Sequence, residues 1–412
     1  MKIEVDGSRL ISEIESLASI SDAEAPAVTR IVFTSTDLKA RAWLRARCEE
    51  TGLSVRQDAI GNTFARWYGS NPAAPAVATG SHIDAIPNAG KYDGVVGVLG
   101  SLEAIRALQR SGFHPTHSIE LLVFTSEEPT RFGIGCLGSR MLSGALSPEA
   151  ARQLKDSEGT SLEKVREGAG LRGELETLKL PLSYYKAFVE LHIEQGPLLE
   201  RQRIPLGVVT SIAAPASMRI SIEGAGGHAG GVLMADRRDA LCAAAELILA
   251  IENAARSGGA IDTVATVGIC EVFPGAVNSI PSRVCLSVDI RDTDLKRRDG
   301  VMQQTESAAR AIAVKRQVSI HTELVNADAP ADCAPEVIEA LSESCRKHNL
   351  PFLRMVSRAY HDSLFMSRIA PTAMLFIPCR NGYSHRPDEY ASPEDIGRGT
   401  LVLAETLTAL SR

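Results

Sequence analysis

The residues best suited to chemistry are His82 and Asp84, with Asp93 nine positions further on in a glycine-bounded stretch. Residues 76–80 form a short, mostly apolar run, which predicts a buried strand that ends near His82. Side chains two apart on extended backbone share a face, so the Asp84 carboxylate can fix the tautomer of His82 while the other ring nitrogen binds a metal. Asp93 could bridge two such metals. Taken alone, these residues are more often a solvated pair at a strand end than a metal site.

Further residues of ligating type occur at or near the ends of other predicted strands. Glu127 and Glu128 end one strand-like run, His192 lies inside an apolar strand, and His385 follows a buried strand. Singly they are typical of an acidic turn, a core histidine and an exposed loop histidine. With the residues above they offer three imidazoles and two carboxylates, a mixture that suits zinc or manganese better than calcium. Two metals would activate a bridging water, and Glu127 could carry its proton.

Composition places the chain among ordinary globular proteins. It has 412 residues, 44% hydrophobic and 23% charged, with a net charge of −6. The length favours more than one domain, and the charge argues against a nucleic-acid or anionic-membrane partner. The eight cysteines form no Cys-x-x-Cys pattern, which is typical of reduced thiols in a cytoplasmic protein. We expect no targeting segment and no membrane span.

The order of strand and helix patterns predicts an α/β protein with an insertion. Strands and helices alternate to about residue 145, which favours a mostly parallel mixed sheet covered by helices. Between 213 and 325 the order becomes β-α-β-β-α-β, that of a ferredoxin-like α+β unit. The predicted domains are therefore a catalytic domain formed by 1–212 and 326–412, interrupted by an inserted domain at 213–325.

Residues 133–138 match the dinucleotide-binding pattern G-x-G-x-x-G. The match does not directly follow a predicted strand, and no acidic strand end follows it about twenty residues later. We therefore expect no dinucleotide cofactor.

The inserted segment carries candidates of its own. His228 lies in a glycine-rich turn, where substrate could approach the backbone closely. Asn278 follows Pro-Gly on a turn, a place where asparagine is common for backbone reasons alone. Arg291 and Asp289 share one face of a strand, so Arg291 could pair with a substrate carboxylate or simply with a neighbouring acid.

Several of these segments together resemble a known family. The His-x-Asp, Gly-Lys-Tyr-Asp-Gly, Glu-Glu and late histidine segments, and the motif at residues 192–197 (HIEQGP), are similar to those of the dinuclear metallo-amidohydrolases. That family includes allantoate amidohydrolases, N-carbamoyl-L-amino acid hydrolases, β-ureidopropionases of one lineage and ureidoglycolate amidohydrolases, and is related to aminoacylases and metallo-carboxypeptidases. The resemblance spans nearly the whole chain, and the motif at 192–197 is typical of the carbamoyl-hydrolysing branch.

Within the family, three segments resemble the ureidoglycolate amidohydrolases: 125–133, Tyr360 before His361, and 377–385. The resemblance implies metal-dependent hydrolysis of the ureido group of (S)-ureidoglycolate to glyoxylate, ammonia and carbon dioxide, in purine catabolism. The alternatives are an allantoate amidohydrolase and an N-carbamoyl-L-amino acid hydrolase. A metal-free binding protein on the same fold would be expected to have lost a ligand or the base.

The resemblance also implies roles for individual residues. Two divalent metal ions, most simply Mn²⁺ with Zn²⁺, Co²⁺ or Ni²⁺ as alternatives, would activate a bridging hydroxide, with Glu127 as general base and Asp84 orienting His82. One metal would be held by His82, Asp93 and His192, and the other by Asp93, Glu128 and His385. Substrate would be bound by Gln195, His228, Asn278, Arg291, Tyr360 and His361, with His228 also stabilising the oxyanion. The inserted domain would serve as a lid and as the interface of a homodimer.

Overall fold

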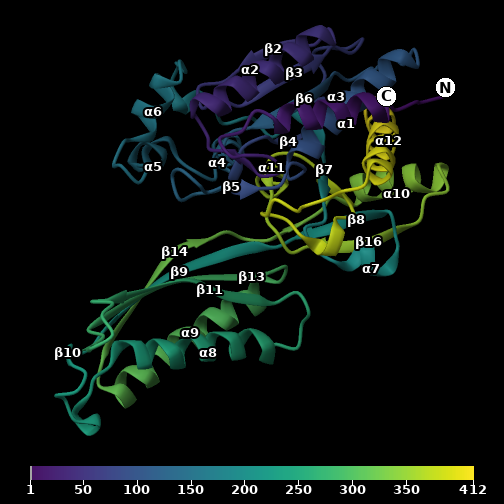
Figure 1. Ribbon diagram of the computed structural model, residues 1–412. Helices are drawn as coiled ribbons and strands as arrows, with labels where there is room; N and C mark the ends of the chain where they lie inside the picture. The colour runs from purple at the N-terminus through teal and green to yellow at the C-terminus, as the bar shows by residue number, and fades with distance from the viewer. Residues whose placement is uncertain (1) are drawn as a thin grey trace. The chain divides into compact units, whose positions relative to one another are not determined.

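The computed structural model describes residues 2–412, which form two compact units. The first unit contains the chain up to Thr210 together with Asp332–Met355 and His361–Arg412. The second contains Ser211–Ala331 and Val356–Tyr360. Figure 1 shows the elements of both units.

A nine-stranded mixed sheet forms the frame of the first unit. The central neighbours β17, β7, β4 and β6 run parallel, while β3 and β2 continue the sheet antiparallel. The strands in spatial order are β15 (Ala331–Asp332), β8 (Leu206–Ile212), β17 (Thr372–Ile377), β7 (Tyr185–Ile193), β4 (Ala76–His82), β6 (Ile119–Phe124), β3 (Thr63–Trp67) and β2 (Ser54–Gln57), with β16 (Phe352–Ser357) paired to β8.

Long helices cover one face of this sheet. Helix α3 packs against β4, β6 and β7; α1 and α12 pack against α3, and α10 packs against α12. Glycines let α3 come close, because a Cβ on Gly97 would lie 2.3 Å from the Leu191 carbonyl oxygen. The helices are α1 (Gly7–Ala18), α3 (Val95–Arg110), α10 (Pro335–Lys347) and α12 (Pro393–Leu410), while α2 (Ser35–Glu50) packs beside β2.

The alternation of side chains along the strands decides what faces the other side. In β7, Leu191 meets α3, so Phe188 and His192 point to the opposite face. There Phe188 joins an apolar cluster with Leu142 of α4 (Leu137–Ser143) and Met366 of α11 (Asp362–Met366). His192 therefore lies on the face that α4 and α11 cover.

Strand β4 obeys the same alternation. Ala76 and Ala78 belong to the cluster on the α4 and α11 face, so His82, at the last position of β4, points to that face too. The next strand, β5 (Ala85–Ala89), pairs with β1 (Val28–Arg30) and brings the chain to Asp93. The sequence predicted a loop here, and the short β5 strand was missed.

The second unit has the predicted β-α-β-β-α-β order. Its four strands are mutually antiparallel in the order β11-β13-β9-β14, which confirms the ferredoxin-like unit. Every second residue of β13 from Val284 to Ile290 is buried under the two helices. The elements are β9 (Ala214–Glu223), α8 (Ala240–Ser257), β11 (Val264–Phe273), β13 (Arg283–Asp292), α9 (Leu295–Arg316) and β14 (Ser319–Ala327).

Short elements complete the two units. The first unit adds α5 (Pro148–Gln153), α6 (Leu162–Gly168), η1 (Leu175–Thr177), α7 (Leu198–Gln202) and η3 (Arg380–Gly382). The second adds a two-stranded ribbon of β10 (Gly227–His228) and β12 (Ser279–Ile280), and η2 (Met234–Asp236).

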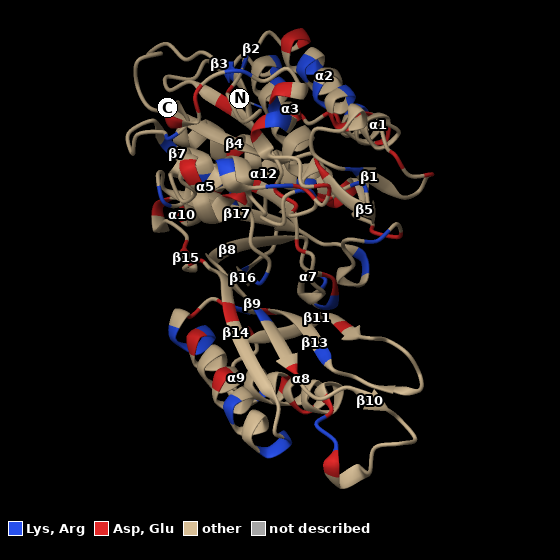
Figure 2. Cartoon of the chain, turned by 90° about the vertical axis from the view of Figure 1, so that its left-hand side faces the viewer, with Lys and Arg blue, Asp and Glu red and all other residues tan. Residues whose placement is uncertain are grey.

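Acidic and basic side chains are interspersed along the outer helices, as Figure 2 shows for α2 and α9. Many of them pair within one helix, such as Arg45 with Glu49 and Arg310 with Glu306. Within residues 2–412, none of the helices combines the length and the apolar character that crossing a membrane requires.

Candidate metal centre

All five residues predicted to bind metal meet in the first unit. The Nε2 atoms of His82 and His192 lie 3.6 and 3.2 Å from Oδ1 of Asp93. The Nε2 atom of His385 lies 3.2 Å from the other Asp93 oxygen and 3.2 Å from Oε1 of Glu128. Two three-residue groups thus share Asp93, one with His82 and His192 and one with Glu128 and His385.

The two buried imidazoles are held with the same nitrogen facing the cluster. Nδ1 of His82 lies 3.0 Å from the backbone oxygen of Asp84, and Nδ1 of His192 lies 2.9 Å from that of Ile193. A proton on each Nδ1 satisfies these carbonyl groups and leaves Nε2 as the lone-pair atom. This is the arrangement expected of metal-binding histidines.

The carboxylate of Asp84 does not make the contact predicted for it. It lies 3.8 Å from Nδ1 of His82, and the backbone carbonyl of the same residue takes its place. Instead, the two carboxylate oxygens accept hydrogen bonds from the backbone N–H groups of Glu127 and Glu128, at 3.2 and 3.0 Å. Asp84 therefore fixes both the imidazole and the turn that carries the two glutamates.

Asp93 is supported by residues that sequence reasoning missed. Glu389, which is 4% exposed, accepts the backbone N–H groups of Tyr92 and Asp93. The Ser384 hydroxyl donates to Asp93 at 2.8 Å, and the Gln195 amide donates to it at 2.7 Å. Only the nearness of Glu389 and Ser384 to His385 in the sequence could have signalled them. Gln195, predicted to bind substrate, donates from its amide nitrogen to Asp93.

Glu127 lies beside the cluster, with its two oxygens facing different neighbours. Oε2 is 3.8 Å from Nε2 of His82, while Oε1 accepts a hydrogen bond from the Cys136 thiol at 3.4 Å. Burial, with the nearby charge of Glu128 adding to it, raises the pKa of Glu127 well above its usual value. A carboxylate with a raised pKa is suited to accept and return a proton.

The charges of the centre fit a divalent cation. Hydrogen bonds with Asp93 and then Glu128 raise the pKa of His385 to about 11. The carboxylates thus favour positive charge where the ring nitrogens converge, and a metal ion would supply it. Gly94 keeps this space open, because a Cβ there would lie 2.5 Å from Nε2 of His82. The donor set of imidazole nitrogens and carboxylate oxygens suits a first-row transition metal.

Strained backbone occurs at several positions around the centre. Of the ten non-glycine residues with positive φ angles among residues 2–412, four belong to segments of the centre: Ser126 (54°), Cys136 (55°), Gln195 (53°) and His385 (59°). Such conformations are uncommon outside glycine and persist where the surrounding structure imposes them. Ser126 and Gln195 lie just after β6 and β7, where the chain leaves these strands, and Cys136 directly precedes α4.

His361, the N-cap residue of α11, packs against the predicted metal ligand His192. Its ring centroid lies 4.4 Å from that of His192, and His361, His192 and Glu190 could ligate a common ion by distance. The Glu190 carboxylate is already engaged, since it accepts hydrogen bonds from the Ser81 hydroxyl and from the backbone N–H and hydroxyl of Ser363. Glu190 therefore anchors the start of α11, and with it His361. Sequence reasoning missed Glu190, which lies within the apolar run of β7.

The other predicted substrate ligands lie in the second unit, where they form two pairs. His228 and Asn278 are exposed neighbours, because the backbone N–H of Ala229 donates to the Asn278 carbonyl. Arg291 stacks over Tyr360, with 5.4 Å between the guanidinium carbon and the ring centroid. Arg291 also forms a two-point ion pair with Asp289 at 2.8 and 3.0 Å, the intrastrand pairing that its sequence position allowed.

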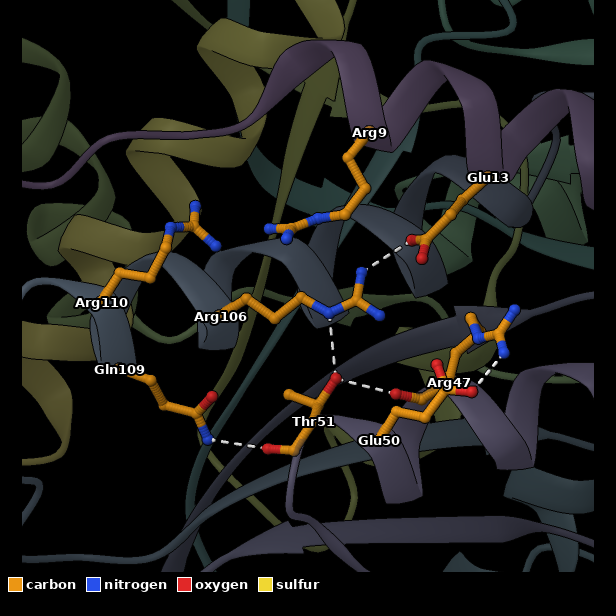
Figure 3. A pocket seen from close by; sticks show the side chains of 8 residues that line it. All are labelled: Arg9, Glu13, Arg47, Glu50, Thr51, Arg106, Gln109 and Arg110. Atoms are coloured by element: carbon orange, nitrogen blue, oxygen red, sulfur yellow. Dashed lines mark hydrogen bonds and ion pairs between the residues drawn. The ribbon is translucent and has the colours of Figure 1, made fainter.

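A separate hollow of about 560 Å³ lies between α1, α2 and α3 (Figure 3). Its four arginines are all paired with acids. Arg106 binds Glu13, Arg47 binds Glu50, and Arg9 and Arg110 both bind Glu103. This arrangement is typical of an ion-pair network that joins helices, and we assign it no ligand.

Comparisons with known proteins relate the chain to hydrolases. The model of peptidase family M20/M25/M40 matches residues 78–409. The chain is 52% identical to a ureidoglycolate hydrolase of Oryza sativa subsp. japonica over 414 residues, covering 99% of this chain and 85% of that protein. It is 37% identical to an N-carbamoyl-L-amino acid amidohydrolase of Geobacillus stearothermophilus, over 99% of both chains.

Solved structures are similar to this chain over nearly its whole length. The crystal structure of AtUAH in complex with (S)-hydroxyglycine superposes with a TM-score of 0.93 at 51% identity, covering 99% of this chain and 98% of that one. The structure of AtUAH in complex with glyoxylate matches equally well.

Proposed function

The chain belongs to peptidase family M20/M25/M40, and we propose that it hydrolyses the ureido group of (S)-ureidoglycolate. The observation that carries this proposal is the likeness, over 99% of this chain, to a protein crystallised with (S)-hydroxyglycine and with glyoxylate. Hydroxyglycine is what remains of ureidoglycolate after hydrolysis removes its carbamoyl group, and glyoxylate forms from hydroxyglycine by loss of ammonia. The ligand cluster of the first unit supplies the chemistry such a reaction needs.

The candidate ligand groups allow a metal site to be proposed. The family is metal-dependent, and the described residues contain fitting ligand groups. We propose two ions, Mn²⁺ by family resemblance, held by His82, Asp93 and His192 and by Asp93, Glu128 and His385. Bound there, the metals would supply Lewis-acid activation of a water and of the ureido carbonyl.

The chain's own residues move the proton. The carboxylate of Glu127, fixed by the Asp84 contact to its backbone, accepts a proton from the attacking water and returns it to the leaving nitrogen. The C–N bond that breaks releases carbamate, which decomposes to carbon dioxide and ammonia, and hydroxyglycine, which decays to glyoxylate and ammonia. His361 lies against His192 and is proposed to contact substrate there.

Residues of the second unit are proposed to bind the substrate as well. Arg291 and Asn278 would bind the substrate carboxylate, Tyr360 its hydroxyl, and His228 the oxyanion. Gln195 keeps its amide oxygen to offer to substrate, since the amide nitrogen binds Asp93.

We also propose a homodimer formed through the inserted domain, 213–325. Support comes from the strong exposure of apolar side chains near His228 and Asn278, namely Leu233 at 72%, Met234 at 77% and Val277 fully exposed. Strong exposure of large apolar side chains is typical of a surface that another chain covers. Light scattering on the purified protein tests this, and a monomer at micromolar concentration contradicts it.

A cytoplasmic location is proposed as well. It rests on the cysteines, all eight of which are free in the described residues. Proteins of oxidising compartments more often pair their cysteines.

The substrate is tested by comparing three compounds. Ammonia release is measured from (S)-ureidoglycolate, allantoate and an N-carbamoyl-L-amino acid, each with added Mn²⁺. We expect ureidoglycolate to be hydrolysed with the highest kcat/KM, and glyoxylate to form in step with ammonia. A clear preference for allantoate or the carbamoyl compound would contradict the proposal.

A further inference from the structure

The G-x-G-x-x-G stretch at 133–138 has a place in the structure that the metal centre does not explain. Its last residues pair with the end of β6, through hydrogen bonds from the N–H groups of Cys136, Leu137 and Gly138 to the carbonyls of Glu127, Ser126 and Thr125, at 2.8 to 2.9 Å. Gly138 is required for this approach, because a Cβ there would lie 2.7 Å from the Thr125 nitrogen. This glycine-rich stretch therefore packs directly against the turn that carries Glu127.

Cys136 is the residue of the glycine-rich stretch whose side chain contacts the Glu127 side chain. It is fully buried and has left-handed backbone angles, φ 55° and ψ 34°, which are uncommon for a residue with a Cβ. Its backbone N–H binds the Glu127 carbonyl, and its thiol donates to Oε1 of the same glutamate at 3.4 Å. Among residues 2–412, the Cys136 thiol is the group that donates a hydrogen bond to the Glu127 carboxylate.

We propose that Cys136 is a positioning residue for the reaction, whose thiol fixes Oε1 of Glu127 so that Oε2 faces the ligand cluster. The geometry supports this division, because Oε2 is the oxygen that lies 3.8 Å from Nε2 of His82. The inference rests on the proposed role of Glu127 as the base. It gives the glycine-rich stretch a purpose other than nucleotide binding.

A thiol is well suited to this task. The S–H group is a weak donor on a small, largely apolar side chain. It can therefore orient a carboxylate without the stronger neutralising hydrogen bond that a hydroxyl, an amide or a cation would give. Burial raises the pKa of the Cys136 thiol well above its usual value, so the thiol keeps its proton and acts as a donor.

Kinetics of two substitutions test the proposal. We expect Cys136→Ala to lower kcat about tenfold, the effect of losing one orienting hydrogen bond, with KM for ureidoglycolate changed less than about twofold. Cys136→Ser keeps a donor at this position and should restore part of the lost kcat, because its hydroxyl orients Glu127 but also binds the carboxylate more strongly than the thiol does. The metal content of both variants should match that of the parent. Cys345→Ala, which truncates a fully buried cysteine in α10, is the matched control and should leave kcat unchanged.

A spectroscopic measurement separates this inference from the substrate proposal. The S–H stretching band is recorded by infrared difference spectroscopy on the purified, metal-loaded protein, without substrate. The band assigned to Cys136 by its loss in Cys136→Ala, or by its loss in Cys136→Ser should the alanine variant not fold, should shift in Glu127→Gln. A band that does not shift, or a folded Cys136→Ala with parental kcat, overturns the inference. Failure of the parent to hydrolyse ureidoglycolate would overturn the substrate proposal and leave the infrared result standing.

Discussion

At the scale of single residues, the centre contains side chains predicted to bind a metal and other groups that hold those side chains in position. His82 and His192 are aimed by backbone carbonyls, and Asp93 is aimed by Glu389. Asp84 acts on two partners at once, through its carbonyl and its carboxylate. Substitutions should therefore fall into two classes: those that lower kcat with the metals still bound, and those that lower the affinity for metal.

Glu127→Gln belongs to the first class. Glutamine keeps the size of the side chain but cannot take a proton, so we expect kcat to fall by about a thousandfold while both metals stay bound. The measurement is steady-state ammonia release together with metal analysis of the same sample. Glu158→Gln, in an exposed loop, is the control and should behave as the parent. Near-parental turnover of metal-loaded Glu127→Gln would exclude this residue as the base.

Glu389→Ala belongs to the second class. It removes the acceptor for the backbone N–H groups of Tyr92 and Asp93, so the bridging carboxylate loses its support. Loss of such an outer partner typically weakens metal affinity 10- to 100-fold, and we expect about that change in a metal-buffered titration. Asp388→Ala removes the neighbouring, exposed acid that pairs with Arg386 and should leave the affinity unchanged. Equal affinity in both variants would contradict the role given to Glu389.

The sequence could predict the ligands but not their supports. His82 and Glu128 stand at the ends of apolar strands, and strand ends meet at one edge of a parallel sheet, so their types and positions were informative. Glu190 lies inside an apolar strand, and Glu389 lies in a loop with no motif of its own. Their roles depend on partners that the fold brings close, Ser363 for Glu190 and Asp93 for Glu389. Contacts between residues so far apart in sequence leave no local pattern.

At the scale of elements, buried ion pairs join neighbouring helices and contribute to the stability of their packing. Glu103 of α3 has no exposed side-chain surface and binds Arg9 of α1, Arg110 and the backbone N–H of Asp6. We expect Glu103→Ala to lower the free energy of unfolding by about 2 kcal/mol, since hydrogen bonds to a buried charge are lost. Urea denaturation measures this. Glu50→Ala, at an exposed pair with Arg47, should change it by less than about 0.5 kcal/mol. Similar losses in both variants would refute the distinction.

The second unit contains a pair whose effect depends on pH. Burial raises the pKa of Asp292, but hydrogen bonds from Arg297 and Thr263 outweigh it, and the net pKa lies below its usual value. A folded-state pKa below the unfolded one adds stability above about pH 4, and this stability is lost as pH falls through the lower folded value.

Asp292→Asn tests this directly. We expect the variant to be less stable than the parent at pH 7, by about 2 kcal/mol, and the gap to narrow as the pH falls below about 4. Chemical denaturation at a series of pH values provides the measurement. Glu306→Gln, at an exposed pair on α9, serves as the control. A gap that stays constant with pH would mean that the Asp292 charge is not the cause.

The sequence predicted elements well where periodicity was clear. The alternation in β13 and the order of the ferredoxin-like unit were both found. The short β5 strand, Ala85–Ala89, was missed because Pro87 and Asn88 interrupt it, and its pairing with β1 is set by the fold. The glycine-rich stretch at 133–138 shows the same limit, since its pattern suggested a nucleotide and its contacts point to Glu127.

At the scale of the whole molecule, every predicted metal ligand belongs to the first unit, while α8 and α9 belong to the second. Metal binding should therefore stabilise the two units unequally. A ligand that binds only the folded state adds stability as RT ln(1 + [L]/Kd), about 4 kcal/mol at a thousandfold excess over Kd. The crowded carboxylates around Asp93 make this gain local, because the cation neutralises charges that otherwise repel one another.

Hydrogen exchange with and without metal tests this prediction. After removal of metal with a chelator, we expect activity to be lost and exchange to rise in the segments that carry the ligands, near residues 82–93, 127–138, 192–195 and 385–389. Exchange in α8 and α9 should stay the same, because the candidate ligand groups found within residues 2–412 all lie in the first unit. Adding Mn²⁺ should restore both activity and protection. Equal changes in both units, or none near Asp93, would show that the metal is not held by the cluster described above.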